Sequence, residues 1–224
     1  MEYFHKDING QPIQLPVGKV VCVGRNYVDH VKELNNEVPD NPLLFMKPST
    51  SLCNVNAGVT LPANTLGSCH NELEIAILIK SPLKNASQSD CQSAIWGVGL
   101  ALDLTLRDLQ SKLKSKGLPW ERAKSFDGAC PVSGFTEIHN VADLQALSFS
   151  LEVNQQLKQQ GDTSLMMWGV YSLLSQISEV FTLLPGDIVL TGTPKGVGPL
   201  FANDELCLRL DKHFSVNSKV QGEK

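Results

Sequence analysis

The stretch SCHNELEIAILIK, residues 68–80, places Glu72 and Glu74 one residue apart beside an apolar run of the kind that fills a protein core. Side chains of a β-strand alternate between its two faces, so the two glutamates share one face and the aliphatic residues around them share the other. Two carboxylates held this close repel each other, and burying either one without a partner is costly. The stretch therefore predicts a strand whose glutamates meet a positive charge, or alternatively an edge strand with a solvated acidic face.

A second apolar stretch, GVGLALDLTLRD at residues 97–108, favours the first of these interpretations. Alternation places Asp103 on the same face as Gly99, Ala101 and Thr105, so one carboxylate projects from a face of small residues. A turn or cap role is the structural alternative for this aspartate. Three carboxylates without a required histidine predict a hard divalent cation held by oxygen, Mg²⁺ or Mn²⁺ with Ca²⁺ as an alternative, whereas zinc is disfavoured.

Length and composition predict one globular domain. The chain has 224 residues, 42% of them apolar and 19% charged, with a net charge of −4. We expect residues 18–212 to form a single domain that carries the site, between a short N-terminal segment (1–17) and a polar C-terminal tail (213–224). The slightly acidic balance gives no electrostatic reason to expect nucleic acid or an anionic membrane surface as a partner.

The cysteines and the N-terminus predict a cytoplasmic protein. Six cysteines occur without a CxxC pair or the clustered spacing of a zinc site, which is typical of free thiols in a reducing compartment. The opening MEYFHKDING lacks the apolar region of a signal peptide, and no run approaches the roughly 20 apolar residues that span a bilayer. We therefore expect no membrane attachment.

Apolar patterning predicts more strands than helices, without regular strand–helix alternation. This favours an α+β, mainly β fold with a mixed sheet over a doubly wound one. The polar stretch at 35–42 contains two prolines and follows a short helix, which is typical of a mobile lid. The expected elements are strands at 19–24, 72–80 and 96–105, helices at 25–34, 107–117 and 166–180, a hairpin at 147–161, and a turn, strand and glycine-rich loop at 183–198.

Six motifs in order resemble the fumarylacetoacetate hydrolase family over roughly Lys19 to Leu210. They are GRNYVDHVKEL (24–34), LLFMKPST (43–50), HNELEIAILI (70–79), ALDLTLRDLQ (101–110), KGLPWERAKSFDGACPVSGF (116–135) and LTGTPKGVGP (190–199). The likeness is greatest to small members described as acylpyruvate hydrolases, oxaloacetate decarboxylases or tautomerases. It implies a mixed β-sheet roll, a homodimer, and Mg²⁺ or Mn²⁺ held by Glu72, Glu74 and Asp103.

The resemblance also implies three catalytic residues. Lys124, in RAKSF, would anchor a carboxylate or a metal-bound water; its structural alternative is an exposed loop lysine. His30 and Glu33 lie three apart, so on a helix they share a face and the carboxylate can orient the imidazole. In the family this pair belongs to a lid and activates water. An ordinary surface pair is the alternative.

The substrate contacts implied by the resemblance are Arg25, Lys47, Gln110 and Thr193. Arg25 could instead pair with a structural acid, and the Thr193 hydroxyl could cap the tight turn before Pro194.

One position departs from the family. Relatives commonly have a second histidine where this chain has Asn71, which faces away from the glutamates in a regular strand, so the three ligands are retained. His70, beside it, is interpreted as a structural hydrogen-bonding residue rather than as a ligand.

Together these features predict a metal-dependent hydrolase that cleaves a carbon–carbon bond in acylpyruvates such as fumarylpyruvate or acetylpyruvate, through a metal-stabilised enolate. The substrate would be a small 2-keto acid or dicarboxylate. Alternatives are an oxaloacetate decarboxylase or tautomerase, which passes through the same enolate, and a 2-hydroxyhepta-2,4-diene-1,7-dioate isomerase. A non-catalytic metabolite-binding protein is disfavoured, because metal chelation alone would require neither His30 nor Glu33.

Overall fold

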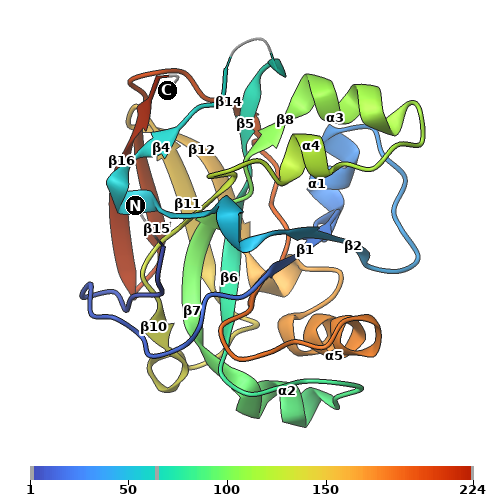
Figure 1. Cartoon of the computed structure of the whole chain (residues 1–224), viewed down its shortest axis with the longest axis vertical. Helices are drawn as coiled ribbons and strands as arrows, with labels where there is room; N and C mark the ends of the chain where they lie inside the picture. The colour runs from blue at the N-terminus through green and yellow to red at the C-terminus, as the bar shows by residue number, and fades with distance from the viewer. Residues whose placement is uncertain (1–2, 64–65, 223–224) are drawn as a thin grey trace.

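The antiparallel pair of β6 (Leu73–Ile79) and β7 (Ile95–Leu102) forms the centre of the molecule in a computed structural model that describes residues 3–63 and 66–222 (Figure 1). Every residue of β6 is buried, because protein packs on both faces of the strand. Helix α2 (Gln88–Ala94) joins the two strands and starts at a capping box made by Ser87 and Asp90.

An eight-stranded mixed sheet surrounds this pair in the order β2-β1-β13-β6-β7-β9-β3, with β10 paired on β7. Strand β1 runs parallel to β13, and β3 runs parallel to β9, while the other pairings are antiparallel. The remaining bounds are β1 (Val20–Gly24), β2 (Leu43–Lys47), β3 (Leu52–Asn54), β9 (Cys130–Val132), β10 (Thr136–Glu137) and β13 (Ile188–Leu190).

Two smaller sheets complete the β structure. A five-stranded sheet has the order β12-β11-β15-β16-β4, and a three-stranded sheet has the order β14-β5-β8. Buried and more exposed residues alternate along β11 and β15, so the five-stranded sheet packs one face on the core. The bounds are β4 (Val59–Thr60), β5 (Cys69–Asn71), β8 (Thr105–Leu106), β11 (Ser148–Val153), β12 (Gln156–Asp162), β14 (Gly198–Pro199), β15 (Glu205–Leu210) and β16 (Phe214–Gln221).

The helices gather in two groups (Figure 1). Helices α3 and α4 pack together on the side of the molecule where α1 lies, while α5 packs against α2 at the other end of β6 and β7. No helix in residues 3–63 and 66–222 is long and apolar enough to cross a membrane. The bounds are α1 (Val28–Glu33), α3 (Arg107–Lys114), α4 (Glu121–Lys124) and α5 (Val170–Val180), with short 3₁₀ turns η1 (Ser49–Ser51), η2 (Val55–Ala57), η4 (Ile138–Asn140) and η5 (Thr163–Leu165).

The predicted α+β, mainly β fold with a mixed sheet is confirmed. The predicted hairpin corresponds to β11 and β12, and the helix predicted after it corresponds to α5. Each of the six cysteines is a free thiol.

The predicted polar tail is wrong, because residues 214–221 form strand β16 between β15 and β4. Only Val216 and Val220 of this strand are buried, and Ser215, Asn217 and Lys219 are exposed, so composition alone suggested a tail. Residues 223–224 lie outside the described part.

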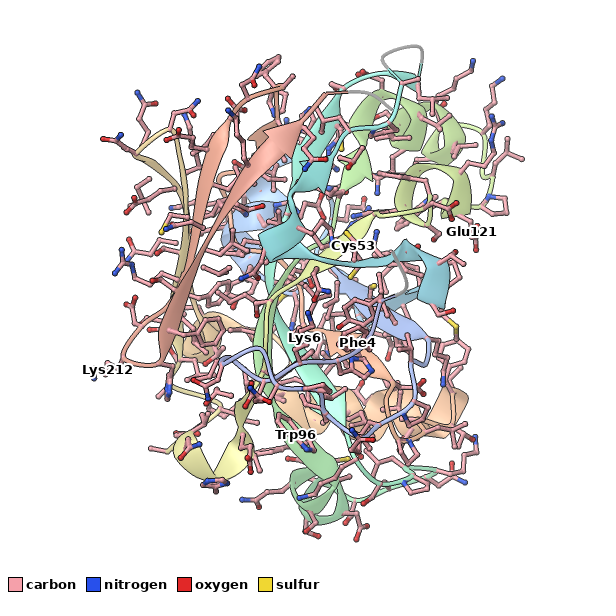
Figure 2. The ribbon with its side chains drawn as sticks, turned by 60° about the vertical axis from the view of Figure 1, so that its left-hand side comes forward. Phe4, Lys6, Cys53, Trp96, Glu121 and Lys212 are labelled. Carbon is pink, nitrogen blue, oxygen red and sulfur yellow. The ribbon has the colours of Figure 1, made fainter. Side chains whose placement is uncertain are left out.

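The N-terminal segment packs on the large sheet instead of extending from it. Figure 2 marks it by Phe4 and Lys6. Its backbone pairs with Phe135, whose amide donates to Lys6 O at 2.9 Å. Two side chains of this segment, His5 and Ile13, are buried. The predicted segment 1–17 therefore belongs to the same folded unit, apart from residues 1–2, which lie outside the described part.

Candidate active site

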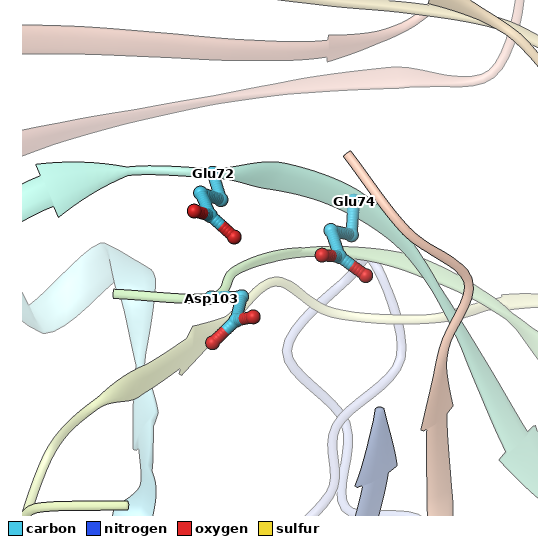
Figure 3. A group of neighbouring side chains, drawn as sticks. All are labelled: Glu72, Glu74 and Asp103. Carbon is cyan, nitrogen blue, oxygen red and sulfur yellow. The ribbon is translucent and has the colours of Figure 1, made fainter. Parts of the chain in front are cut away.

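The three predicted metal ligands lie together at one end of the central strand pair. Because β6 and β7 are antiparallel, the start of β6 pairs with the end of β7, and Leu73 lies opposite Leu102. Glu72 precedes β6 and Asp103 follows β7, and the Asp103 amide donates to Glu72 O at 2.8 Å. Figure 3 shows the carboxylates of Glu72, Glu74 and Asp103 gathered around a common space. All three are buried, and a carboxylate oxygen of each lies within 4.8 Å of the others.

The electrostatics of Glu74 fit a site for a hard cation. Its Oε2 accepts a hydrogen bond from the Gly192 amide at 2.6 Å. Gly192 has φ +97°, and a Cβ there would lie 2.6 Å from the Cβ of Asn26, so this close approach requires glycine. Burial raises the pKa of Glu74 well above its ordinary value, and the charges of Asp103 and Glu72 raise it further. A divalent cation would compensate this excess of buried negative charge.

Asp103 offers a second argument for a metal. Its Oδ1 is buried and forms a salt bridge with Lys47 Nζ at 2.8 Å. A carboxylate oxygen has two lone pairs, so Oδ1 retains one for an additional ligand. An all-carboxylate donor set matches the preference of Mg²⁺ and Mn²⁺, so the residues fit the predicted ion.

Lys124 lies inside the carboxylate cluster, which excludes the exposed-loop alternative. Its Nζ donates to Glu72 Oε2 at 2.8 Å, Asp103 Oδ2 at 2.6 Å and Thr105 Oγ1 at 2.7 Å. Burial lowers the pKa of Lys124, but the charges of Asp103 and Glu72 outweigh burial and raise it above its ordinary value. Lys124 is therefore a fixed cation that holds two of the three carboxylates in place.

Arg107, at the start of α3, belongs to the site although the sequence analysis missed it. Its Nη2 pairs with Glu72 Oε1, and its Nη1 donates to Gln110 Oε1 at 2.7 Å. Burial alone would raise the pKa of Glu72, but Lys124 and Arg107 together lower it below its ordinary value. The sequence signal that could have identified Arg107 is its position at the start of a helix, directly after the apolar stretch that contains Asp103.

The predicted substrate residues differ in how they are placed. Gln110 lines the pocket, and its oxygen is engaged by Arg107. Lys47 does not line it, because the fully buried side chain lies behind Asp103 and donates to backbone carbonyls of Lys124 and Ala129. Its position therefore corresponds to support of Asp103 and not to the expected contact with substrate.

Thr193 lines the pocket, but its hydroxyl is already engaged. It donates to Leu73 O at 2.9 Å and accepts from Gln159 Nε2 at 2.8 Å. Gln159, on β12, is buried, and its Oε1 accepts from the Leu73 amide and from Asn71 Nδ2, each at 2.8 Å. Asn71 thus faces away from the glutamates, as predicted, and its amide contributes to a network that supports the start of β6.

Gln159 is a further residue that the sequence analysis missed. A bulge between β11 and β12 places Gln159 on the buried face while Leu157 is exposed, so regular strand alternation gave no signal for it. His70 Nε2 contacts Ser68 Oγ at 3.2 Å. This is the structural role that was predicted for His70.

Helix α1 covers the pocket with the predicted histidine–glutamate pair. His30 is buried and lines the pocket, with its Nδ1 3.3 Å from Glu33 Oε2. The other oxygen of Glu33 accepts from the Gly196 amide at 2.9 Å, and Lys195 donates to Asp29 at 3.0 Å. The glycine-rich loop therefore holds α1 over the carboxylates. His30 is therefore part of the pocket wall, and Glu33 contacts it from outside the pocket.

Arg25 lies at the mouth of the same pocket. Its Nη1 donates to Glu37 O at 3.2 Å and its Nη2 to Asn36 Oδ1 at 3.1 Å. It forms no salt bridge with a carboxylate in the described part of the chain. The alternative, that Arg25 pairs with a structural acid, is therefore not supported there.

The pocket is narrow and partly open to solvent, with a volume of about 60 Å³. We expect α1 and the segment after it to move when a keto acid enters. The three carboxylates, His30 and cationic side chains all line the pocket.

Comparison with known proteins agrees with this geometry. The chain matches the family Fumarylacetoacetate (FAA) hydrolase C-terminal over residues 19–221. Oxaloacetate tautomerase YcgM of Escherichia coli is 47% identical over 219 residues, which cover 97% of this chain and 99% of that protein.

Two solved structures extend the comparison. A fumarylpyruvate hydrolase from Pseudomonas aeruginosa, in complex with Mn²⁺ and pyruvate, superposes with a TM-score of 0.91 at 30% identity, covering 100% of this chain and 97% of that one. A 2-hydroxyhepta-2,4-diene-1,7-dioate isomerase from Mycobacterium marinum superposes with a TM-score of 0.79 at 36% identity, covering 93% and 76%. The chain therefore belongs to the fumarylacetoacetate hydrolase family.

Proposed function

We propose that this protein is a divalent-metal-dependent enzyme that interconverts the keto and enol forms of oxaloacetate. The observation that carries the proposal is a buried imidazole, His30, that lines the same small pocket as a buried three-carboxylate cluster. The choice of oxaloacetate is supported by the tautomerase that is 47% identical over almost the whole of both chains. This favours the alternative over the acylpyruvate hydrolysis that was the first prediction from the sequence.

The metal would be held by Glu72, Glu74 and Asp103. Mg²⁺ or Mn²⁺ bound there would supply a Lewis acid that polarises the carbonyl of a 2-keto acid. The Mn²⁺ and pyruvate in the fumarylpyruvate hydrolase structure support an ion of this kind and a keto-acid ligand.

Tautomerisation requires one proton to move between carbon and oxygen. The bond between C3 and one hydrogen breaks, a bond between the C2 oxygen and a hydrogen forms, and no water is added. His30 would remove the proton from C3, because its imidazole lines the pocket. Glu33 Oε2, beside His30 Nδ1, fixes the orientation of the ring. Lys124 stays charged and keeps Glu72 and Asp103 in place.

Acylpyruvate hydrolysis is the second candidate, since the same residues serve both reactions. Hydrolysis would need His30 to activate a water for attack on a second carbonyl, and the His30–Glu33 contact is the arrangement for this. The fumarylpyruvate hydrolase with a TM-score of 0.91 supports the candidate. The lower TM-score of the dienedioate isomerase gives weaker support to the third alternative.

Parallel assays on the Mg²⁺-loaded protein test the proposal. Loss of the enol absorbance of oxaloacetate measures tautomerisation, pyruvate formation measures decarboxylation, and fumarylpyruvate consumption measures hydrolysis. We expect tautomerisation to have the highest kcat/KM and to disappear with EDTA. A kcat/KM for fumarylpyruvate above that for enol-oxaloacetate would instead support the hydrolase.

A further inference from the structure

The side chain of Asn36 joins two cations at the mouth of the pocket. Its Oδ1 accepts hydrogen bonds from Arg25 Nη2 at 3.1 Å and from Lys114 Nζ at 2.9 Å. The three residues come from different parts of the chain: the end of β1, the segment after α1 and the last turn of α3. A neutral amide oxygen between a guanidinium and an ammonium occupies a position that suits a carboxylate better.

The two cations have no carboxylate partner in residues 3–63 and 66–222. Arg25 donates only to Asn36 and to a backbone carbonyl, and Lys114 donates only to Asn36. Neither takes part in a salt bridge, whereas the carboxylates of the pocket are engaged by Lys47, Lys124 and Arg107. The positive charge at the mouth is therefore available to a ligand.

The backbone and the surroundings direct this charge into the pocket. Arg25 has φ 62°, a left-handed conformation that is strained for a residue with a side chain and is concentrated at functional sites. Partial burial lowers the pKa of Lys114, and the neighbouring charges of Arg25 and Arg107 lower it further. An anion at this point would relieve the repulsion among the three cations.

We propose that Arg25 and Lys114 bind the second carboxylate of a dicarboxylate substrate, and that this carboxylate takes the place of the Asn36 side-chain oxygen. The inference rests on the proposed function, in which the keto-acid end of oxaloacetate lies on the metal-ligand side. The other end then points toward the mouth, which Arg25, Asn36 and Lys114 line. A ligand with a methyl group at that end gains nothing from the two cations.

Asn36 thereby links substrate choice to the lid. When the ligand carboxylate replaces its oxygen, Arg25 and Lys114 hold the ligand, and the segment after α1 shifts to admit it. Lys114 and Asn36 are specificity-determining residues in this account, while His30 remains the proton-transfer residue.

The first test measures binding without turnover. Calorimetric titrations of the Mg²⁺-loaded protein with malate and with 2-hydroxybutyrate compare ligands that differ only by a carboxylate in place of a methyl group. The wild type should prefer malate, and Lys114→Met should lower malate affinity about tenfold, the order of one charged hydrogen bond. Its affinity for 2-hydroxybutyrate should stay unchanged. Lys112→Met, on the exposed side of the same helix, is the matched control and should behave as wild type.

The second test uses Asn36. In Asn36→Asp a permanent carboxylate should occupy the site, raise the KM for oxaloacetate about tenfold and leave kcat nearly unchanged. Asn36→Ala should leave KM equal or lower, because no side-chain oxygen competes.

The outcomes separate the two proposals. Equal losses for both titrants in Lys114→Met, or no loss for either, would overturn the carboxylate site. A preference for malate that Lys114→Met removes, in a protein that does not tautomerise oxaloacetate, would support the site and reject the proposed function. A malate preference that survives Lys114→Met would also overturn the site.

Discussion

The floor and the mouth of the pocket are built in opposite ways. The floor consists of Glu72, Glu74, Asp103 and Lys124, which are 5% exposed or less. Lys124 donates to Glu72 at 2.8 Å and to Asp103 at 2.6 Å, and the Gly192 amide donates to Glu74 at 2.6 Å. The floor lies at the ends of central strands. The mouth lies on a six-residue helix without a side-chain cap and on the segment after it. The floor is thus organised before substrate arrives, while the mouth can open and close.

This difference matches the two tasks of the site. Charges that must stabilise developing negative charge work best when they need no rearrangement, and a rigid sheet provides this. Entry and selection of substrate require movement, and a short helix that depends on a few exposed contacts is easily displaced. The contacts that fix α1, Glu33 with Gly196 and Asp29 with Lys195, both come from the glycine-rich loop.

The largest expected effect is at the floor, in Glu74→Gln. Removing one anionic ligand should lower Mg²⁺ affinity and reduce kcat/KM for oxaloacetate about 10³-fold. The metal-free variant should be about as stable as the wild type, because the raised pKa of Glu74 already favours its neutral form and glutamine keeps an acceptor for the Gly192 amide. Calorimetry of Mg²⁺ binding, tautomerisation rates and thermal unfolding measure the three quantities. Asp108→Asn, a surface carboxylate on α3, is the control; full Mg²⁺ affinity in Glu74→Gln would disprove the ligand set.

The next effect is at the mouth, in His30→Gln. Without the imidazole, kcat for tautomerisation should fall by about 10² to 10⁴, the range for a positioned general base. Mg²⁺ affinity should not change, since His30 belongs to the lid. Lys32→Gln on the exposed face of α1 should retain full activity. A parallel loss of Mg²⁺ binding in His30→Gln would mean that floor and mouth are not separate.

A third prediction concerns motion. Amide hydrogens of residues 27–42 should exchange faster than those of β6 and β7 in the metal-free protein, because most of the segment is exposed and makes few contacts. Binding of Mg²⁺ and malate should slow exchange in the segment while the strands stay as they were. Hydrogen exchange measured by mass spectrometry decides this; equal protection with and without ligand would rule out a moving lid.

Gln159→Leu tests the support behind the floor and should have a moderate effect. The substitution leaves the Leu73 amide and Asn71 Nδ2 without their buried acceptor, which costs about 1–3 kcal/mol of unfolding free energy. Mg²⁺ affinity should fall by about tenfold, as is typical when groups that support metal ligands are removed. Urea unfolding and calorimetry measure both. Gln160→Leu, on the exposed face of β12, should change neither; an unaffected Gln159→Leu would show that β6 holds its position unaided.

The smallest effect is expected far from both regions, at His5. Its Nε2 donates toward the carbonyls of Pro16 and Gly186 at 3.1 and 3.0 Å, and burial lowers its pKa below the ordinary value of 6.5 despite these bonds. The unfolded chain therefore binds this proton at a higher pH than the folded chain, and stability should fall as pH drops below about 6.5. Denaturant titrations between pH 5 and 7 should show a shallower slope in His5→Gln than in His139→Gln, an exposed control. Equal slopes would mean that His5 does not contribute.

The sequence predicted the floor better than the mouth. Alternation along two apolar stretches was enough to bring Glu72, Glu74 and Asp103 together, because strand geometry is regular and a buried carboxylate is rare. The strand is interrupted at Glu72, between β5 and β6, but the three carboxylates still lie together. The burial of Lys124 between two of these carboxylates depends on contacts between distant segments, which spacing cannot provide.

The failures have the same origin. Lys47 was expected in the pocket, but whether a residue near a site faces it or lies behind it depends on how β2 packs under Asp103. Strand β16 looked like a polar tail because just two of its residues are buried. Asn36 and Lys114 were missed because a polar loop and an exposed helix end give no periodic signal.

The most direct test of the central claim is the fate of the C3 proton. In D₂O, with Mg²⁺ and enol-oxaloacetate, the keto product can be reduced to malate as it forms and its deuterium content read by NMR. If a single imidazole above the floor transfers the proton, the wild type should place one deuterium on one face of C3, and His30→Gln should lose this selectivity together with the rate. Deuterium distributed equally over both faces in the wild type, as in the uncatalysed reaction, would contradict the account.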